Sequence, residues 1–389
     1  MSRLLTRYAI AVGSMPAANE AVNLTPKDPE VYRVRARLSS QLHQPASAKL
    51  DLERAVSLRP KDDYLWLELG NVRDDLDDTS GAQVALDQAV KWAPYYAHTR
   101  WQRANLKLRM GQYDEAFDEF RSAAASNPTF YPNLIDLAWG LSRGDVSATE
   151  QMVQIVDDSQ RLQFARFLVR KGKGRESLDQ LSLIKGPVSE DSSRDILRQL
   201  YTTKCFREAF ELWNVGKNSS QLPPILIDGG FEGDITFDAT GFGWLISSDQ
   251  QKVSLSQDAA ERDTGNRSLH VRFEGESSPG SQLMTQTLVV NREQRYRLSF
   301  AVKTNALVSG GLPVVAISDV DGKHVIAKSE HFPETTSGWQ QMSFEFRSLP
   351  DSDAVVLSLQ RNGCPSNPCP IFGSIWLDSF SIQEIKTDH

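Results

Sequence analysis

The residue types that carry most enzyme chemistry are present, but they do not stand at catalytic spacings. The histidines are scattered, at His43, His98, His270, His324, His331 and His389. None has a partner at the spacing of a catalytic triad or of a paired metal ligand. The acidic runs Asp74–Asp75 and Asp77–Asp78 are explained by solvated loop charge, and no carboxylate pair stands out as a glycosidase pair. We therefore expect a binding protein rather than an enzyme.

Two of the cysteines stand close together. Cys364 and Cys369 lie in the segment NGCPSNPCP, where they either close a small disulfide ring or remain free thiols. The disulfide is the favoured alternative, and it implies an oxidising compartment. A zinc site would need four ligands, and no second Cys or His pair stands at metal spacing.

Length and charge limit the class of protein. The chain has 389 residues, which is too long for one typical domain, and its net charge of -7 argues against nucleic acid as the main partner. No apolar run approaches the roughly 20 residues that cross a bilayer. Arg3 and Arg7 precede an apolar stretch too weak for a signal peptide by itself. We expect a periplasmic or extracellular protein and leave open an export or anchoring segment outside this sequence.

A period of 34 residues organises the first half of the chain. Pro26, Pro60, Pro94 and Pro128 keep this step. Four further columns keep it as well: Ala21, Ala55, Ala89 and Ala123; Ala48, Ala82 and Ala116; Ala36, Gly70 and Ala104; Leu52, Leu86 and Phe120. Small residues let two helices approach closely, and proline ends the second helix of each unit. A fixed period of this length is typical of a helical repeat array.

The columns resemble the tetratricopeptide repeat, with small residues at its eighth, twentieth and twenty-seventh positions and proline at its thirty-second. Residues 29–130 hold three full repeats, and Ala17–Pro26 and Tyr131–Leu141 match parts of neighbouring ones. The resemblance implies an α-α superhelix over residues 1–216. Its regular repeats would cover about 17–142, and degenerate repeats would cover 143–216, as terminal units of such arrays are usually atypical.

The same resemblance implies a concave groove lined by the first helix of each repeat. The inward positions include Arg33 at the fifth position of the first full repeat. The residues at inward positions that we expect to contact a peptide are Arg37, Asn71, Trp101, Asn105 and Arg109. Asn71 and Asn105 share the ninth position, and stacked asparagines can hold an extended peptide backbone because each side chain both donates and accepts hydrogen bonds. We expect a protein partner in this groove. The alternative is that these residues are merely solvated.

Past a linker at 217–224 the pattern changes to alternating apolar and polar residues. Strands are predicted at 269–273, 295–302, 340–347, 354–361 and 374–382, which indicates an antiparallel β-sandwich over residues 225–386. The order of LIDGGFEGD, TGNRSLHVRF, RYRLSFAV and IWLDSFSI resembles carbohydrate-binding module family 4/9, a galactose-binding-like jelly roll.

This second resemblance implies a structural calcium ion where the first strand, a neighbouring loop and the last strand meet. The candidate ligands are Gly230, Glu232, Asn266, Ser268 and Asp378. Calcium takes about six to eight oxygen ligands, which carboxylates and backbone carbonyls supply. The alternative is that Glu232 and Asp378 are exposed charges at strand ends.

A sugar site on the sandwich would need exposed aromatic rings with polar groups around them. The candidates are Phe237, Phe242, Trp244, Phe332 and Asn362. We expect a protein-binding helical groove joined to a sandwich that binds polysaccharide, as in components of a bacterial envelope or of exopolysaccharide assembly. The alternative is an interaction scaffold without a sugar site. An exposed aromatic strip would favour the first function, and an apolar sandwich face buried against the helices would favour the second.

Overall fold

The computed structural model describes residues 1–215, 222–233, 235–237, 241–246, 253–275, 277–278, 280–364 and 368–386. The backbone of 236–237 is described without its side chains. Part of the predicted linker, residues 217–221, lies outside these ranges. The chain forms two compact units, Met1–Gln163 and Phe164–His389, and each is described by itself.

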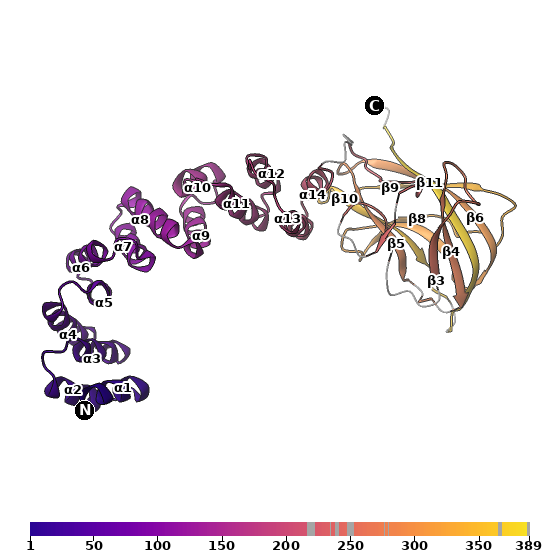
Figure 1. The fold of residues 1–389 in the computed structure, drawn as a ribbon. Coiled ribbons are helices and arrows are strands. Elements are labelled where there is room, and N and C mark those ends of the chain that lie inside the picture. The colour runs from indigo at the N-terminus through magenta and orange to yellow at the C-terminus, as the bar shows by residue number, and fades with distance from the viewer. Residues whose placement is uncertain are drawn as a thin grey trace. The chain divides into compact units, whose positions relative to one another are not determined.

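The first unit is an array of antiparallel helix pairs (Figure 1). Its helices are α1 (Ser2–Val12), α2 (Met15–Leu24), α3 (Pro29–Gln41), α4 (Pro45–Leu58), α5 (Asp63–Asp75), α6 (Thr79–Trp92), α7 (Ala97–Arg109), α8 (Tyr113–Ser126), η1 (Pro128–Phe130), α9 (Tyr131–Leu141) and α10 (Val146–Val153). The first helices α3, α5, α7 and α9 begin 34 residues apart, and each of the four period prolines stands two residues after the end of a second helix. The predicted tetratricopeptide-like register is therefore confirmed.

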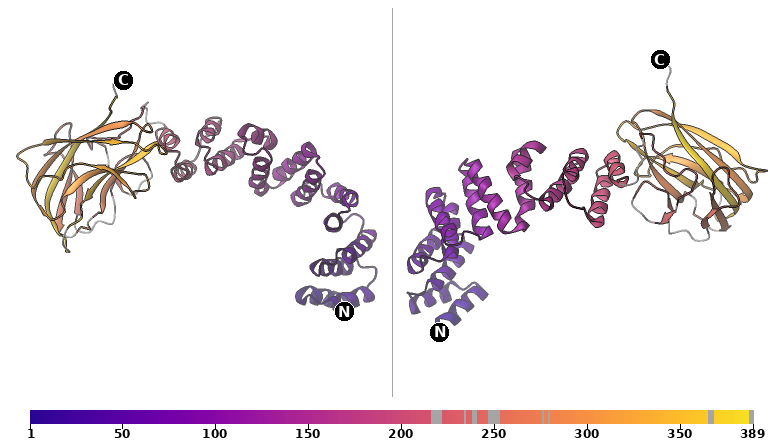
Figure 2. Two further views of the ribbon diagram at one scale, coloured as in Figure 1. Left: turned by 180° about the vertical axis from the view of Figure 1, so that it is seen from behind. Right: turned by 45° about the horizontal axis from the view of Figure 1, so that its top comes forward.

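The small residues of the repeat columns form the contact between paired helices. Ala48, Ala82 and Ala116 are completely buried, and Leu86 fills the space beside Gly70, where a Cβ atom would lie 2.7 Å from the Leu86 Cγ. Both views of Figure 2 show successive helix pairs of this unit side by side. Burial of one face per helix holds the array together, since short helices are marginal on their own.

The second unit begins within α11 (Asp158–Arg170) and continues with α12 (Gly174–Ser182), α13 (Glu190–Thr202) and α14 (Phe206–Trp213). These helices lie in the stretch predicted as degenerate repeats. The change from helix to strand falls near the predicted linker, but the division into compact units comes earlier, between residues 163 and 164. The last helices thus belong to the same compact unit as the sandwich.

The strands form two packed sheets with the order of a β-sandwich. They are β1 (Thr236–Phe237), β2 (Leu245–Ile246), β3 (Val253–Asp258), β4 (Ser268–Gly275), β5 (Gln282–Val289), β6 (Arg295–Ser309), β7 (Pro313–Ser318), β8 (Val325–Lys328), β9 (Gln340–Arg347), β10 (Ala354–Arg361) and β11 (Ile371–Glu384). The order is β1-β2-β5-β10-β7-β8 in one sheet and β3-β4-β11-β6-β9 in the other. Every pairing is antiparallel except that of β1 with β2. The predicted antiparallel sandwich is confirmed, and its core lies between the two sheets.

Candidate binding surfaces

Two asparagines lie at equivalent positions on neighbouring first helices. Asn71 is on α5 and Asn105 is on α7, and these two helices contact each other. Both side chains are half-buried, and neither forms a hydrogen bond with any residue that the structure describes. Their amide groups are therefore available to a peptide backbone.

A charged and aromatic cluster lies on the neighbouring first helices α3 and α5. The Arg33 guanidinium pairs with Glu30 at 2.6 Å, lies 3.7 Å from the Glu68 carboxylate, and sits 5.4 Å from the centroid of the Tyr64 ring. Burial raises the pKa of Glu68, while the charge of the exposed Arg37 favours its ionised form. Sequence reasoning missed Glu68, because it stands one position away from the inward column that holds Arg33.

Two of the predicted groove residues are already engaged in contacts within the array. The Trp101 ring lies 4.5 Å from the Phe120 ring and 4.9 Å from the Phe130 ring, measured between centroids. The guanidinium of Arg109 pairs with Asp74 of the preceding repeat. Trp101 thus serves mainly in packing within its own repeat, and Arg109 must give up an ion pair to bind a ligand.

The predicted aromatic rim of a sugar site is wrong for three residues. Phe332, Phe242 and Trp244 are 0%, 1% and 4% exposed, so no sugar ring can stack on them. Phe332 and Trp244 lie in loops, outside the strands, and their rings fill the sandwich core. The Phe237 side chain lies outside the part of the structure that is described.

Phe242 is buried because the last helices cover it. Its ring lies 5.2 Å from the Tyr201 ring, 5.2 Å from the Phe210 ring and 5.9 Å from the Trp213 ring, between centroids. The Tyr201 hydroxyl donates a hydrogen bond of 2.6 Å to the carbonyl of Gly241. An apolar contact therefore joins α13 and α14 to the loop before β2.

Polar contacts surround this apolar contact. Arg207 on α14 donates to the Asn291 side chain at 2.9 Å and lies 3.5 Å from the Asp353 carboxylate. Lys204 lies 3.2 Å from the carboxylate of Asp321. Asn291 follows β5, Asp353 precedes β10 and Asp321 follows β7, so all three lie at one end of the six-stranded sheet. Burial raises the pKa of Asp353, as expected for an enclosed contact.

A polar cleft of about 900 Å³ lies along the six-stranded sheet. Gln282 and Thr285 on β5 and Gln360 on β10 line it, together with Asn362, whose amide lies 3.0 Å from the His331 ring nitrogen. The described residues that line it include no aromatic side chain. The cleft offers hydrogen bonds to a polar ligand but no stacking platform.

The predicted calcium ligands come from the segments that the resemblance implied. Asp378 on β11 is completely buried, and its carboxylate accepts backbone hydrogen bonds from Asp263 at 2.8 Å, Thr264 at 3.0 Å and Ser379 at 2.6 Å. Burial raises the pKa of Asp378, and the nearby charge of Asp263 acts in the same direction. The prediction that Asp378 is an exposed strand-end charge is therefore wrong.

Glu232 is exposed and holds the same loop from the other side. Its carboxylate accepts backbone hydrogen bonds from Asn266 at 2.6 Å and Arg267 at 3.2 Å, and the Asn266 bond is the largest cause that lowers its pKa. The Ser268 hydroxyl donates to the carbonyl of Glu261 at 2.5 Å. Both predicted carboxylates thus face amide N–H groups.

The fit of these residues to calcium is partial. A carboxylate can accept about four hydrogen bonds or ligand contacts, so both acids keep unused oxygen lone pairs. Gly230 lies beside the Asp378 carboxylate. Nowhere in the described ranges do three or more His, Cys, Asp or Glu residues come together as a metal site. A calcium ion here would draw most of its ligands from backbone carbonyls.

A buried arginine secures the loop that carries the two nearby cysteines. Cys364 and Cys369 are joined as a disulfide, with their Cα atoms 5.9 Å apart. Arg361 is 1% exposed and donates to the carbonyls of Cys369 and Ser277 and to the Ser309 hydroxyl. Arg361 is therefore a structural cation.

The structure defines the class of protein, a tetratricopeptide-like helical array followed by a β-sandwich. Among the described helices, none is long and apolar enough to span a membrane. No protein-family model matches the sequence, and no curated protein matches it.

Several solved structures are similar to parts of the chain. A crystal structure of MamA is 18% identical, covers 36% of this chain and 82% of that chain, and has a TM-score of 0.33. YrrB, described as a TPR protein with an unusual peptide-binding site, is 16% identical over 52% of this chain and 91% of its own, with a TM-score of 0.29. A structure described as "CBM4 structure and function" is 14% identical over 41% of this chain and 100% of its own, with a TM-score of 0.32. These similarities carry no argument about function.

Proposed function

We propose that this chain is a non-enzymatic adaptor whose helical repeats bind an extended segment of a protein partner. The observation that carries the proposal is the pair Asn71 and Asn105, half-buried at equivalent positions and without hydrogen-bond partners among the described residues. Their spacing of one repeat suits a ligand that contacts successive first helices. Arg37, which is exposed beside them along the array, supplies a cation for an acidic side chain of the ligand.

The contact between the sandwich and the last helices supports the scaffold form of this function. Phe242 is covered by helices, and Arg207 adds polar contacts around it. The sandwich is thus attached to α13 and α14 through its own apolar surface, which is the arrangement expected of a module that ends a solenoid. The disulfide between Cys364 and Cys369 supports a site of action in an oxidising compartment, periplasmic or extracellular.

A peptide selection followed by titration tests the proposal. Peptides selected from a random displayed library on the full chain are synthesised, and their affinities are measured calorimetrically. The double variant Asn71→Ala/Asn105→Ala is expected to bind them about tenfold or more weakly, because each asparagine loses backbone hydrogen bonds. Gln88→Ala, on the second helix α6, is the control and should keep full affinity. Peptides that bind both variants equally would contradict the proposal.

Polysaccharide binding is the second candidate function, and the polar cleft favours it. Gln282, Thr285 and Gln360 project from neighbouring strands into one cleft, and amides and hydroxyls of this kind hold sugar hydroxyls. A screen of the full chain against immobilised neutral glycans tests this function. Binding that is lost in Gln360→Ala supports it. Absence of binding by the folded chain would leave the interaction scaffold as the remaining candidate function.

A further inference from the structure

The first helix carries an apolar stripe, flanked by positive charge, that none of the described residues covers. Leu4, Tyr8 and Val12 are 68%, 57% and 56% exposed, and they follow one another at four-residue steps along α1. Arg3 and Arg7 are exposed and flank the stripe, and no acidic residue occurs in α1. Exposed apolar stripes of this kind on a folded protein usually mark a contact surface.

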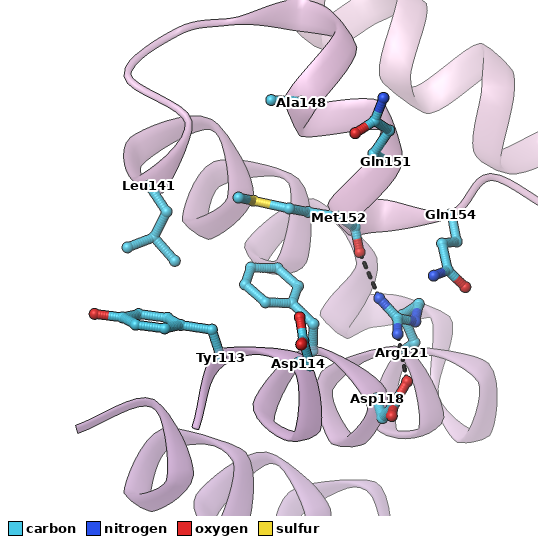
Figure 3. A pocket seen from close by; sticks show the side chains of 10 residues that line it. Tyr113, Asp114, Asp118, Arg121, Leu141, Ala148, Gln151, Met152 and Gln154 are labelled. Atoms are coloured by element: carbon cyan, nitrogen blue, oxygen red, sulfur yellow. Dashed lines mark hydrogen bonds and ion pairs between the residues drawn. The ribbon is translucent and has the colours of Figure 1, made fainter. Parts of the chain in front are cut away.

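A groove on the second-helix side of the same unit is also apolar, but the charge that it offers is negative. It lies between α8 and α10 and has a volume of about 630 Å³ (Figure 3). Phe117, Leu141 and Met152 form its apolar part, and the half-exposed Tyr113 stands at one side. The sequence did not reveal this groove, because it needs the non-repeating end of α10 to close it.

The charges in the groove leave one acid unpaired. Arg121 donates to the carbonyl of Met152 at 2.7 Å and pairs with Asp118, as the dashed lines in Figure 3 mark. Its positive charge is therefore already compensated. Asp114 lines the same groove and forms no ion pair or hydrogen bond with the described residues. A ligand that is apolar and carries a positive charge would complement this groove, since Asp114 is exposed there.

We infer that the groove between α8 and α10 binds the exposed face of α1 from a second copy of this chain. The stripe supplies large apolar side chains for Leu141 and Met152, and Arg3 or Arg7 supplies the partner for Asp114. The helix cannot reach the groove of its own chain, because its other face is fixed against α2 and α3 through Ala9.

Such a contact joins the α1 stripe of one copy to the groove of another. A bound pair therefore still has one free groove and one free stripe. Contacts of this type lead to rings or open filaments rather than to closed dimers. The inference is independent of peptide binding, since Asn71 and Asn105 lie on first helices and the groove lies between second helices. A failure of either proposal leaves the other unaffected.

Mixing two complementary variants tests the contact. Leu4→Ser/Tyr8→Ser removes the stripe and keeps the groove, whereas Met152→Glu blocks the groove and keeps the stripe. Sedimentation velocity of the wild-type chain should show association that grows with concentration. Each variant alone should be monomeric, with self-affinity at least about tenfold lower, because central apolar contacts dominate small interfaces. An equimolar mixture should form a dimer that grows no further. Circular dichroism checks that each variant is folded.

A charge exchange gives a second, independent readout. Asp114→Arg should weaken self-association, and adding Arg3→Glu and Arg7→Glu to the same chain should restore it, because the attraction is reversed on both sides. The inference is overturned by a wild-type chain that stays monomeric at all soluble concentrations. Association that survives in both apolar variants, or variants that fail to pair on mixing, would overturn it as well.

Discussion

Arg361 shows how one buried side chain can organise several loops. Arg361 is 1% exposed, and its guanidinium donates to neutral groups, among them the carbonyls of Ser277 and Cys369 and the sulfur of Cys369. Burial lowers the pKa of Arg361, and no carboxylate of a described residue bonds it. Loss of its donors would leave buried carbonyls unsatisfied.

We therefore predict that Arg361→Met destabilises the sandwich by about 3 kcal/mol. Urea denaturation of the full chain, followed by fluorescence, measures the change. Arg272→Met is the matched control, because Arg272 is on β4 of the same sandwich with its side chain 61% exposed, and it should change stability by less than about 0.5 kcal/mol. Equal effects of the two substitutions would show that Arg361 contributes no more to the stability of the sandwich than an exposed arginine does.

At the scale of elements, the joint between α14 and the sandwich depends on close approach at a glycine. A Cβ atom on Gly241 would lie 2.4 Å from the Nε1 atom of Trp213, whereas a Cβ atom on Gly243 would meet nothing within 4 Å. We predict that Gly241→Ala weakens the joint and destabilises the second unit by about 1–3 kcal/mol, because the indole ring must move. Gly243→Ala should be nearly neutral. Thermal unfolding monitored by tryptophan fluorescence compares them, and a neutral Gly241→Ala would show that the two elements are not held together there.

The same joint shows what the sequence could predict and what it could not. The 34-residue step of Pro26 and its equivalents predicts the helices, since small residues and prolines act locally. Alternation likewise predicts five of the eleven described strands, namely β4, β6, β9, β10 and β11. Neither pattern tells whether an aromatic residue such as Phe242 faces solvent, because that depends on which distant element covers it. Three of the predicted rim aromatics are wrong for this reason, and so is the alternative of an exposed strand-end charge at Asp378, which lies buried in the middle of β11.

At the scale of the whole molecule, the two compact units have separate cores, so we expect two transitions in calorimetric unfolding.

Calcium should raise only the temperature of the second unit's transition. Burial raises the pKa of Asp378, so between the unfolded and folded pKa values the folded state holds the extra proton. Stability from this group therefore falls as the pH rises through that interval. Bound calcium would offset the cost of the ionised form.

The stabilisation by calcium is thus expected to be larger at neutral than at mildly acidic pH, and magnesium should not replace it, because Mg²⁺ requires a tighter octahedron of ligands. Asp378→Asn and Glu232→Gln should each reduce the calcium-dependent shift. The transition of the first unit provides an internal control within every scan. A calcium shift that is absent at neutral pH would show that amide groups such as those of Thr264 and Asn266 alone satisfy the two carboxylates. A shift that persists in both variants would show that calcium does not act through these carboxylates.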